Sequence, residues 1–96
     1  MAIEATVCNV NKTQGVTGTA NTSADLVRPE NRRRRFLYVY VTGAGTALVG
    51  IGGAPGLTGL EATSTAPLLL NAAVLGAVYI RAAAGTVTYK VVEGLE

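Results

Sequence analysis

The sequence predicts an all-β fold, namely a small antiparallel β-sandwich of jelly-roll type with no substantial helix. Short runs of β-branched, aromatic and aliphatic residues recur about every 8–12 residues and are separated by glycine, asparagine and proline, which is typical of sandwiches and barrels. Within several runs, apolar and polar residues alternate with the two-residue period of a half-buried strand. No stretch of about ten residues combines a 3.6-residue period with capping residues, so we expect no amphipathic helix.

The strand predicted to lie at the centre of the fold covers residues 33–42 and is closed by Gly43. It contains the longest run of residues with high β-propensity in the chain. Because successive side chains of a strand point to opposite faces, its aliphatic and aromatic residues separate onto two faces. We expect the aliphatic face to belong to the core, and the aromatic face to be covered by the same chain or by another. The aliphatic face holds Leu37, Val39 and Val41, and the aromatic face holds Phe36, Tyr38 and Tyr40.

Weaker patterns predict the remaining strands. The last of them has the cleanest alternation, because Val87, Tyr89 and Val91 share one face. Turn residues over 11–15 and a Gly/Pro-rich stretch over 52–59 separate neighbouring strands. The predicted strands cover residues 2–10, 16–22, 25–27, 46–51, 60–65, 68–70, 74–81 and 86–92.

The connection after the central strand, residues 43–45, has the sequence Gly-Ala-Gly, which predicts a tight hairpin turn. The segment 46–51 is then expected to return beside the central strand as its antiparallel partner. Gly50 lies within this return segment and indicates a β-bulge there.

The composition indicates one domain over residues 1–96, in which residues 1–15 form an extended N-terminal arm or an edge strand. The chain is 49% hydrophobic with a mean hydropathy of +0.36, which is apolar for its length. Such a chain either exposes an apolar patch or covers it by oligomerising, and we favour a homo-oligomer. The first residues show no signal-peptide pattern. The most apolar window, residues 66–84, is too interrupted for a membrane-spanning helix.

The residues that usually carry catalysis and metal binding are scarce. Histidine is absent, Cys8 is the only cysteine, and the acidic residues are scattered singly along the chain. The glycine-rich stretches match neither the dinucleotide-binding nor the phosphate-binding loop pattern. We therefore expect no enzyme, no catalytic residues, no cofactor and no metal site.

The basic residues are concentrated, because Arg28 and the run Arg32, Arg33, Arg34 and Arg35 fall within about eight positions, a local pattern typical of anion contact. One interpretation is a contact with an acidic patch on a partner protein, and a second is a contact with nucleic-acid phosphate. The alternative is a solvated start of the central strand, in which the arginines pair with Glu30 or Glu93. Nucleic acid is the least favoured, because the rest of the chain shows no basic stripe.

The aromatic face of the central strand allows two interpretations. It could be a stacking platform for sugars or bases, or it could be buried within the sandwich or at a subunit interface, where tyrosine is enriched. We favour burial. Together with the arginine run, this face supplies the candidate partner-contact residues. They are Arg32, Arg33, Arg34, Arg35, Phe36, Tyr38 and Tyr40.

The order of these features resembles a known group of proteins. Asn31-Arg32-Arg33 leads into the alternating strand, T-G-A-G-T-A and a return strand follow, and after a Gly/Pro loop the chain closes with GAVYIRAAAGTVTYKVVEG. Over about residues 16–94 this is similar to the small β-sandwich virion proteins of tailed bacteriophages, namely head decoration (cement) proteins and fibre-base modules. The arginine run is longer than that pattern requires.

The resemblance implies a non-enzymatic structural protein that is made in the host cytoplasm and located on the capsid surface of the virion. Its partner would be the major capsid protein or another virion protein, and it would often act as a trimer that bridges capsid subunits. One alternative is a fibre- or tail-associated module that binds a host glycan. The other, less favoured, is a nucleic-acid-binding protein.

Overall fold

The computed structural model describes residues 12–55, 60–70 and 75–96. Within these ranges the chain forms eight strands and no helix, and therefore no helix long and apolar enough to cross a membrane. The strand predicted over residues 2–10 lies outside the described residues. The strands are β1 (Lys12–Ala20), β2 (Asp25–Arg28), β3 (Arg34–Thr42), β4 (Ala47–Ile51), β5 (Leu60–Ala62), β6 (Leu68–Leu70), β7 (Val78–Ala82) and β8 (Val87–Leu95).

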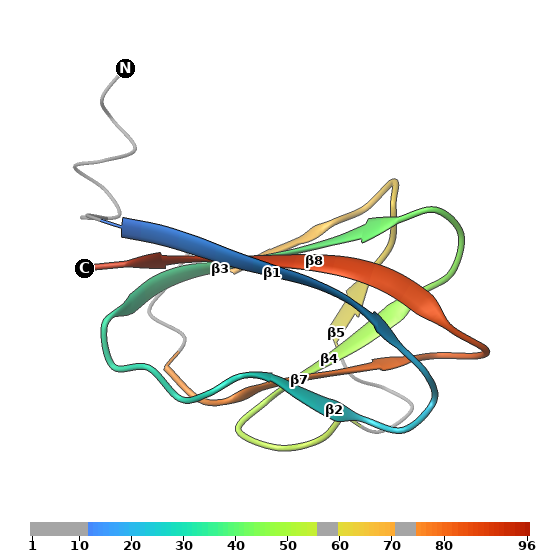
Figure 1. Cartoon of the computed structure of the whole chain (residues 1–96), viewed down its shortest axis with the longest axis horizontal. Helices are drawn as coiled ribbons and strands as arrows, with labels where there is room; N and C mark the ends of the chain where they lie inside the picture. The colour runs from blue at the N-terminus through green and yellow to red at the C-terminus, as the bar shows by residue number, and fades with distance from the viewer. Residues whose placement is uncertain (1–11, 56–59, 71–74) are drawn as a thin grey trace.

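The strands form two four-stranded antiparallel sheets that pack face to face (Figure 1). The first sheet has the order β1-β8-β3-β6, and the second has the order β2-β7-β4-β5. Pairing of β1 with β8, β2 with β7, β3 with β6 and β4 with β5 is the topology of a jelly roll, in which a long antiparallel hairpin is wrapped into two sheets. The predicted fold class is confirmed.

The core lies between the inner faces of the two sheets. On β3, Leu37, Val39 and Val41 are fully buried, which confirms the predicted aliphatic face. On β8, Val87, Tyr89 and Val91 point into the same core. Each such side chain contributes about 1.5–3 kcal/mol through its removal from water.

The connection at residues 43–45 is not the predicted hairpin. β3 lies in the first sheet, whereas β4 lies in the second and pairs with β5 and β7. Gly43 and Gly45 have positive φ angles of 89° and 110°, a conformation that glycine adopts without steric cost and that lets the chain cross between the sheets. Both sides of β3 are already paired, with β6 and β8, so no edge is left for β4.

Two further local predictions are wrong. Residues 12–15 do not form a turn, because β1 pairs with β8 without interruption from Lys12 to Ala20, and this long ladder overrides the turn preference of a few residues. Gly50 is not at a bulge, since β4 keeps a continuous register with β7. Gly50 instead permits a close approach, because a Cβ there would collide with the carbonyl oxygen of Gly53 and lie 2.7 Å from the nitrogen of Pro55.

The core assignment predicts unequal effects for two leucines. Leu37 is 0% exposed and Leu69 is 56% exposed. Leu37→Ala should lower the free energy of unfolding by about 2–5 kcal/mol, because it opens a cavity in the core. Leu69→Ala, which removes the same atoms from the outer face, should change it by less than about 0.5 kcal/mol. Urea denaturation followed by circular dichroism measures both, and equal losses would show that the core is misassigned.

Candidate partner-binding surface

A β-bulge determines where the arginine run points. Between Phe36 and Arg34 the register of β3 against β8 shifts by one residue, so that Arg35 is an extra residue on β3. Strict alternation from the buried Leu37 would turn Arg34 outward. With the bulge, Arg34 turns into the interior, where its side chain is 0% exposed. Arg34 is therefore not available to a partner, which corrects its place among the predicted contact residues.

The Arg34 guanidinium lies in a buried ion pair with Glu93. Its Nε donates to Oε1 of Glu93 over 2.7 Å, while its Nη1 and Nη2 donate to the carbonyl oxygens of Gly76 and Pro29 over 2.8 and 2.9 Å. These bonds join β3 and β8 to the segments that precede β3 and β7. One of the two acidic partners predicted for the arginine run, Glu93, is confirmed.

The other oxygen of the Glu93 carboxylate is also occupied. Arg28 Nε donates to Oε2 over 2.6 Å, and Gln14 Nε2 donates to the same atom over 2.9 Å. A bulge in β2 between Leu26 and Arg28 turns Arg28 inward, as the bulge in β3 does for Arg34. One arginine from each sheet, Arg34 from the first and Arg28 from the second, therefore binds the carboxylate of Glu93.

Burial alone would raise the pKa of Glu93. Hydrogen bonds from Gln14, Arg34 and Arg28, together with the positive charge of Arg34, outweigh this effect and hold the pKa below its ordinary value of 4.5. A carboxyl group whose pKa is lower in the folded state stabilises the fold above the unfolded pKa. This stabilisation is lost as the pH falls from about 4.5 through the folded pKa.

Glu93→Gln tests this site. The variant should lose about 3–5 kcal/mol of stability at pH 7, because it leaves buried arginine charge without its carboxylate. The difference in free energy of unfolding between wild type and variant should stay constant above about pH 4.5 and shrink below it, since only the wild type has a carboxylate at position 93 that becomes protonated there. Urea denaturation between pH 7 and pH 3 measures this, with the exposed Glu61→Gln as the matched control. A difference that does not change with pH would contradict the assignment.

The other arginines of the run lie at the surface. The guanidinium of Arg33 donates from Nη2 to the carbonyl oxygen of Glu96 over 2.8 Å. Arg35 pairs with the carboxylate of Glu96 at 2.6 Å, and this hydrogen bond, with the charge of Arg35, lowers the pKa of Glu96. Arg32 is exposed, and no ion pair between described residues involves Arg32 or Glu30.

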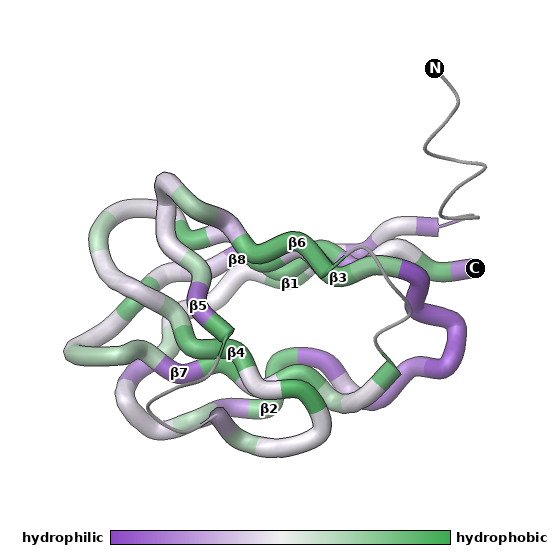
Figure 2. Tube along the Cα trace, turned by 180° about the vertical axis from the view of Figure 1, so that it is seen from behind, coloured by the Kyte–Doolittle hydropathy of each residue, from purple (hydrophilic) through white to green (hydrophobic). Residues whose placement is uncertain are grey.

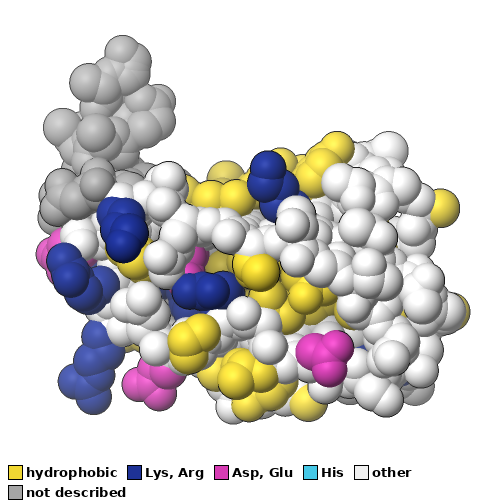
Figure 3. Space-filling model, viewed as in Figure 1, with side chains coloured by type: hydrophobic (Ala, Val, Ile, Leu, Met, Phe, Trp, Pro, Cys, Tyr) yellow, Lys and Arg dark blue, Asp and Glu magenta, His cyan; other side chains and the backbone are white. Residues whose placement is uncertain are grey.

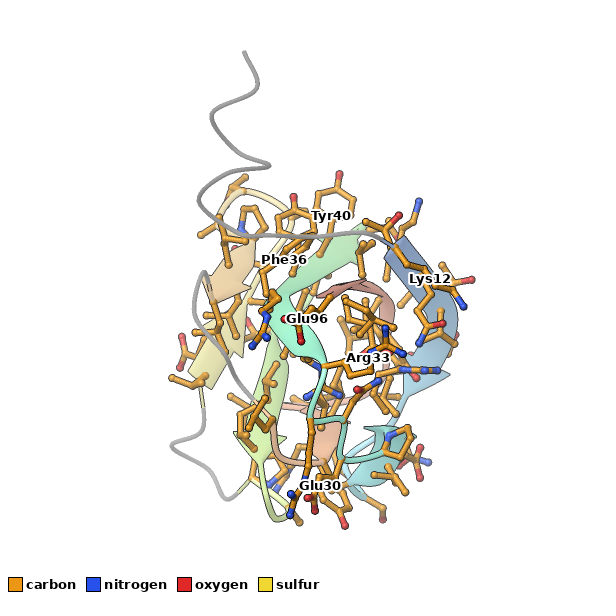
Figure 4. All side chains as sticks on the ribbon, turned by 90° about the vertical axis from the view of Figure 1, so that its left-hand side faces the viewer. Lys12, Glu30, Arg33, Phe36, Tyr40 and Glu96 are labelled. Atoms are coloured by element: carbon orange, nitrogen blue, oxygen red, sulfur yellow. The ribbon has the colours of Figure 1, made fainter. Side chains whose placement is uncertain are left out.

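These residues make one end of the sandwich basic. The β2–β3 connection and the ends of β1 and β8 meet there, as the hydrophilic stretch beside the C-terminus in Figure 2 shows. Figure 4 looks onto this end and labels Lys12, Glu30, Arg33 and Glu96. Away from this end, the described charged residues are two basic ones, Arg81 and Lys90, and two acidic ones, Asp25 and Glu61, so their charges sum to zero. The basic end holds Lys12, Arg28, Arg32, Arg33, Arg34 and Arg35 against Glu30, Glu93 and Glu96.

The predicted aromatic face lies on the outer side of the first sheet. Phe36, Tyr38 and Tyr40 are half-buried, and Phe36 and Tyr40 point away from the second sheet (Figure 4). The rings of Tyr38 and Tyr40 are nearly parallel, with 9° between their planes and 6.4 Å between their centroids. Phe36 covers Gly94, where any Cβ would collide with the ring.

Neighbouring strands extend this apolar surface. In register, Tyr38 lies between Val92 on β8 and Leu69 on β6. Val92 is half-buried and Leu69 is exposed. We name these residues the aromatic strip. The aromatic strip consists of Phe36, Tyr38, Tyr40, Leu69 and Val92.

The second sheet differs, because its own chain covers β4 on both faces. Ala47, Leu48 and Val49 are all buried although they are consecutive, and the loop after β4 folds back against Gly50. The other exposed large apolar residues, Leu26, Leu60 and Leu75, lie on separate segments. In Figure 3, apolar side chains reach the surface in several places of the view shown. Among the described residues, the aromatic strip extends over three adjacent strands, β6, β3 and β8.

Across residues 12–55, 60–70 and 75–96 there is no cavity and no cluster of three acidic or cysteine side chains that could hold a metal ion. Every fully buried side-chain nitrogen and oxygen in these ranges has a hydrogen-bond partner.

No protein-family model matches the chain, and no curated protein matches it. Among solved structures, it is similar to a chain from Bacillus endospore appendages, which are described as a family of disulfide-linked pili. The identity is 17%, the TM-score is 0.51, and 88% of this chain and 87% of the other are covered. RmlC from Streptococcus suis, solved with dTDP-D-xylose, is 14% identical with a TM-score of 0.47, and the match covers 88% of this chain and 45% of that one. The likeness to the appendage chain shows a shared fold.

The sequence prediction named Glu93 as a partner of the arginines without placing it in the core, and it missed three further residues of this region. The inward position of Glu93 could have been predicted, because the alternation of Val87, Tyr89 and Val91 extended by two residues turns Glu93 toward the core. Gln14 could not, since its segment was predicted to be a turn. Leu69 and Val92 join the aromatic strip only through the register of β6 and β8 against β3, which local sequence does not determine.

Proposed function

We propose that the chain is a structural virion protein that decorates the capsid of a tailed bacteriophage by bridging neighbouring capsid subunits. The observation that carries the proposal is the aromatic strip, a contiguous apolar surface on the outside of a sandwich whose core is complete without it. Such surfaces typically mark contact sites. The resemblance of residues 16–94 to virion β-sandwich proteins supplies the capsid as the partner.

The mechanism of cementing would be surface burial. The aromatic strip would remove apolar area of both partners from water, while the exposed arginines at the basic end would form charge-assisted hydrogen bonds with capsid carboxylates. Arg32 and Arg33 are the exposed members of the run, and Arg35 is partly engaged by Glu96. A subunit that contacts two neighbours through two surfaces opposes their separation under internal pressure.

The same proposal places the protein on the capsid surface after synthesis in the host cytoplasm. It would act as a homo-oligomer, and a trimer suits a symmetry axis of the shell. Its partner would be the major capsid protein or another virion protein.

The proposal is tested by decoration of capsids that lack this chain. Wild type should copurify in a copy number that matches capsid symmetry. Arg32→Glu/Arg33→Glu should lower occupancy at least tenfold, because two exposed cations become anions at the proposed contact. Arg81→Glu, which reverses a charge on the second sheet, is the matched control. If the double variant decorates as fully as wild type, the basic end is not a capsid contact, and if wild type does not bind, the proposed function is wrong.

A second candidate is a fibre- or tail-associated module that binds a host glycan. It is favoured by one observation, namely that Tyr38 and Tyr40 are only half-buried and can be reached from solvent. A saccharide titration followed by NMR tests this candidate. Wild type should show chemical-shift changes as saccharide is added, and Tyr38→Ala should abolish them. Nucleic acid remains the least favoured alternative, and retention on DNA that falls steeply with salt would support it.

A further inference from the structure

The outer face of the first sheet carries a cation, Lys90, at the edge of the aromatic strip. Lys90 lies opposite Tyr40 in the register of β8 and β3 and is exposed. No ion pair between described residues involves it. At one end of the same sheet, Arg35 and Glu96 form an ion pair with each other at 2.6 Å.

We propose that the aromatic strip and Lys90 together form the docking surface for a protein partner other than a second copy, and that this partner presents a carboxylate among apolar side chains. The inference rests on the proposed function for the identity of the partner, and it adds the chemistry of the contact and the residue that selects for it. Lys90 is the specificity-determining residue. Aromatic side chains at the centre of an interface supply most of its affinity, whereas a charge among them selects the partner.

Charge complementarity argues against a second copy as the occupant. A second copy that docked through the same face would offer Lys90 no free carboxylate, because the strand register places no acidic side chain on this face and the basic end lies at its rim. The carboxylate at that rim, Glu96, is already held by Arg35. Like charges brought together in an interface oppose binding, so the face is complementary to an acidic partner and not to itself.

Nucleic acid fits this face poorly for a different reason. A phosphate backbone repeats its charge along its length and needs a row of cations, whereas the aromatic strip contains no charge and Lys90 stands alone beside it. A folded protein surface with apolar side chains around one carboxylate matches the strip.

The first test compares two charge reversals in full-length protein on capsids that lack this chain. Lys90→Glu should weaken binding at least tenfold, because it sets a carboxylate against the partner's carboxylate. Arg81→Glu makes the same change in charge on the second sheet and should leave binding within twofold of wild type. If wild type binds and both variants bind equally well, the inference is overturned while the proposed function stands.

The second test needs no capsid, so it distinguishes failure of the inference from failure of the proposed function. Lys90→Met keeps the length of the side chain and removes the charge that separates two copies. Sedimentation equilibrium should show self-association at a concentration at least threefold lower than for wild type. Adding Tyr38→Ser in the same chain should reverse this change. If Lys90→Met associates no more than wild type, Lys90 does not exclude a second copy and the inference is overturned.

Discussion

The buried ion pair between Arg34 and Glu93 is the constraint on which the arrangement of the first sheet depends. Charges with almost no exposure are costly to bury, and a buried pair is rarely a large net source of stability. Its geometry nevertheless requires the bulge at Arg35, because only this extra residue turns Arg34 inward while Leu37 stays in the core. A slip of β3 by one residue would expose the core face and leave Glu93 without Arg34. We infer that the pair selects the register.

This register determines what the molecule presents to its surroundings. With Leu37, Val39 and Val41 inside, the aromatic residues of β3 necessarily lie outside, beside β8 and β6. The two sheets then treat their central strands differently. The chain folds a loop back over β4, whereas the aromatic side chains of β3 remain half-exposed. A partner that covered β3 would leave the central strand of the first sheet covered on both faces, as β4 in the second sheet already is by its own chain.

Local pattern in the sequence was sufficient to predict the fold class and the core faces of β3 and β8, because both depend on alternation within single strands. It failed where the answer depends on distant segments. Gly43 and Gly45 suit both a hairpin and a crossing between sheets, and β6 and β8 decide between them by occupying both edges of β3. The inward direction of Arg34 could not be predicted from local sequence. It depends on a bulge that brings Arg34 to Glu93, which follows about sixty residues later in the chain. Of the predicted contact set, the structure places Phe36, Tyr38 and Tyr40 half-buried on the outer face and buries Arg34, and contact of a partner with the set stays a prediction.

We expect a partner to cover the aromatic strip. Hydroxyl-radical footprinting of free protein and of protein bound to capsids tests it most directly, because both tyrosine and leucine side chains are oxidised when solvent reaches them. Tyr38, Tyr40 and Leu69 should be oxidised in the free protein and at least fivefold less on the capsid. Leu26, which is as exposed as Leu69 but lies on the second sheet, should be unchanged. Equal oxidation of the strip in both states, or protection of Leu26 in its place, would contradict the account.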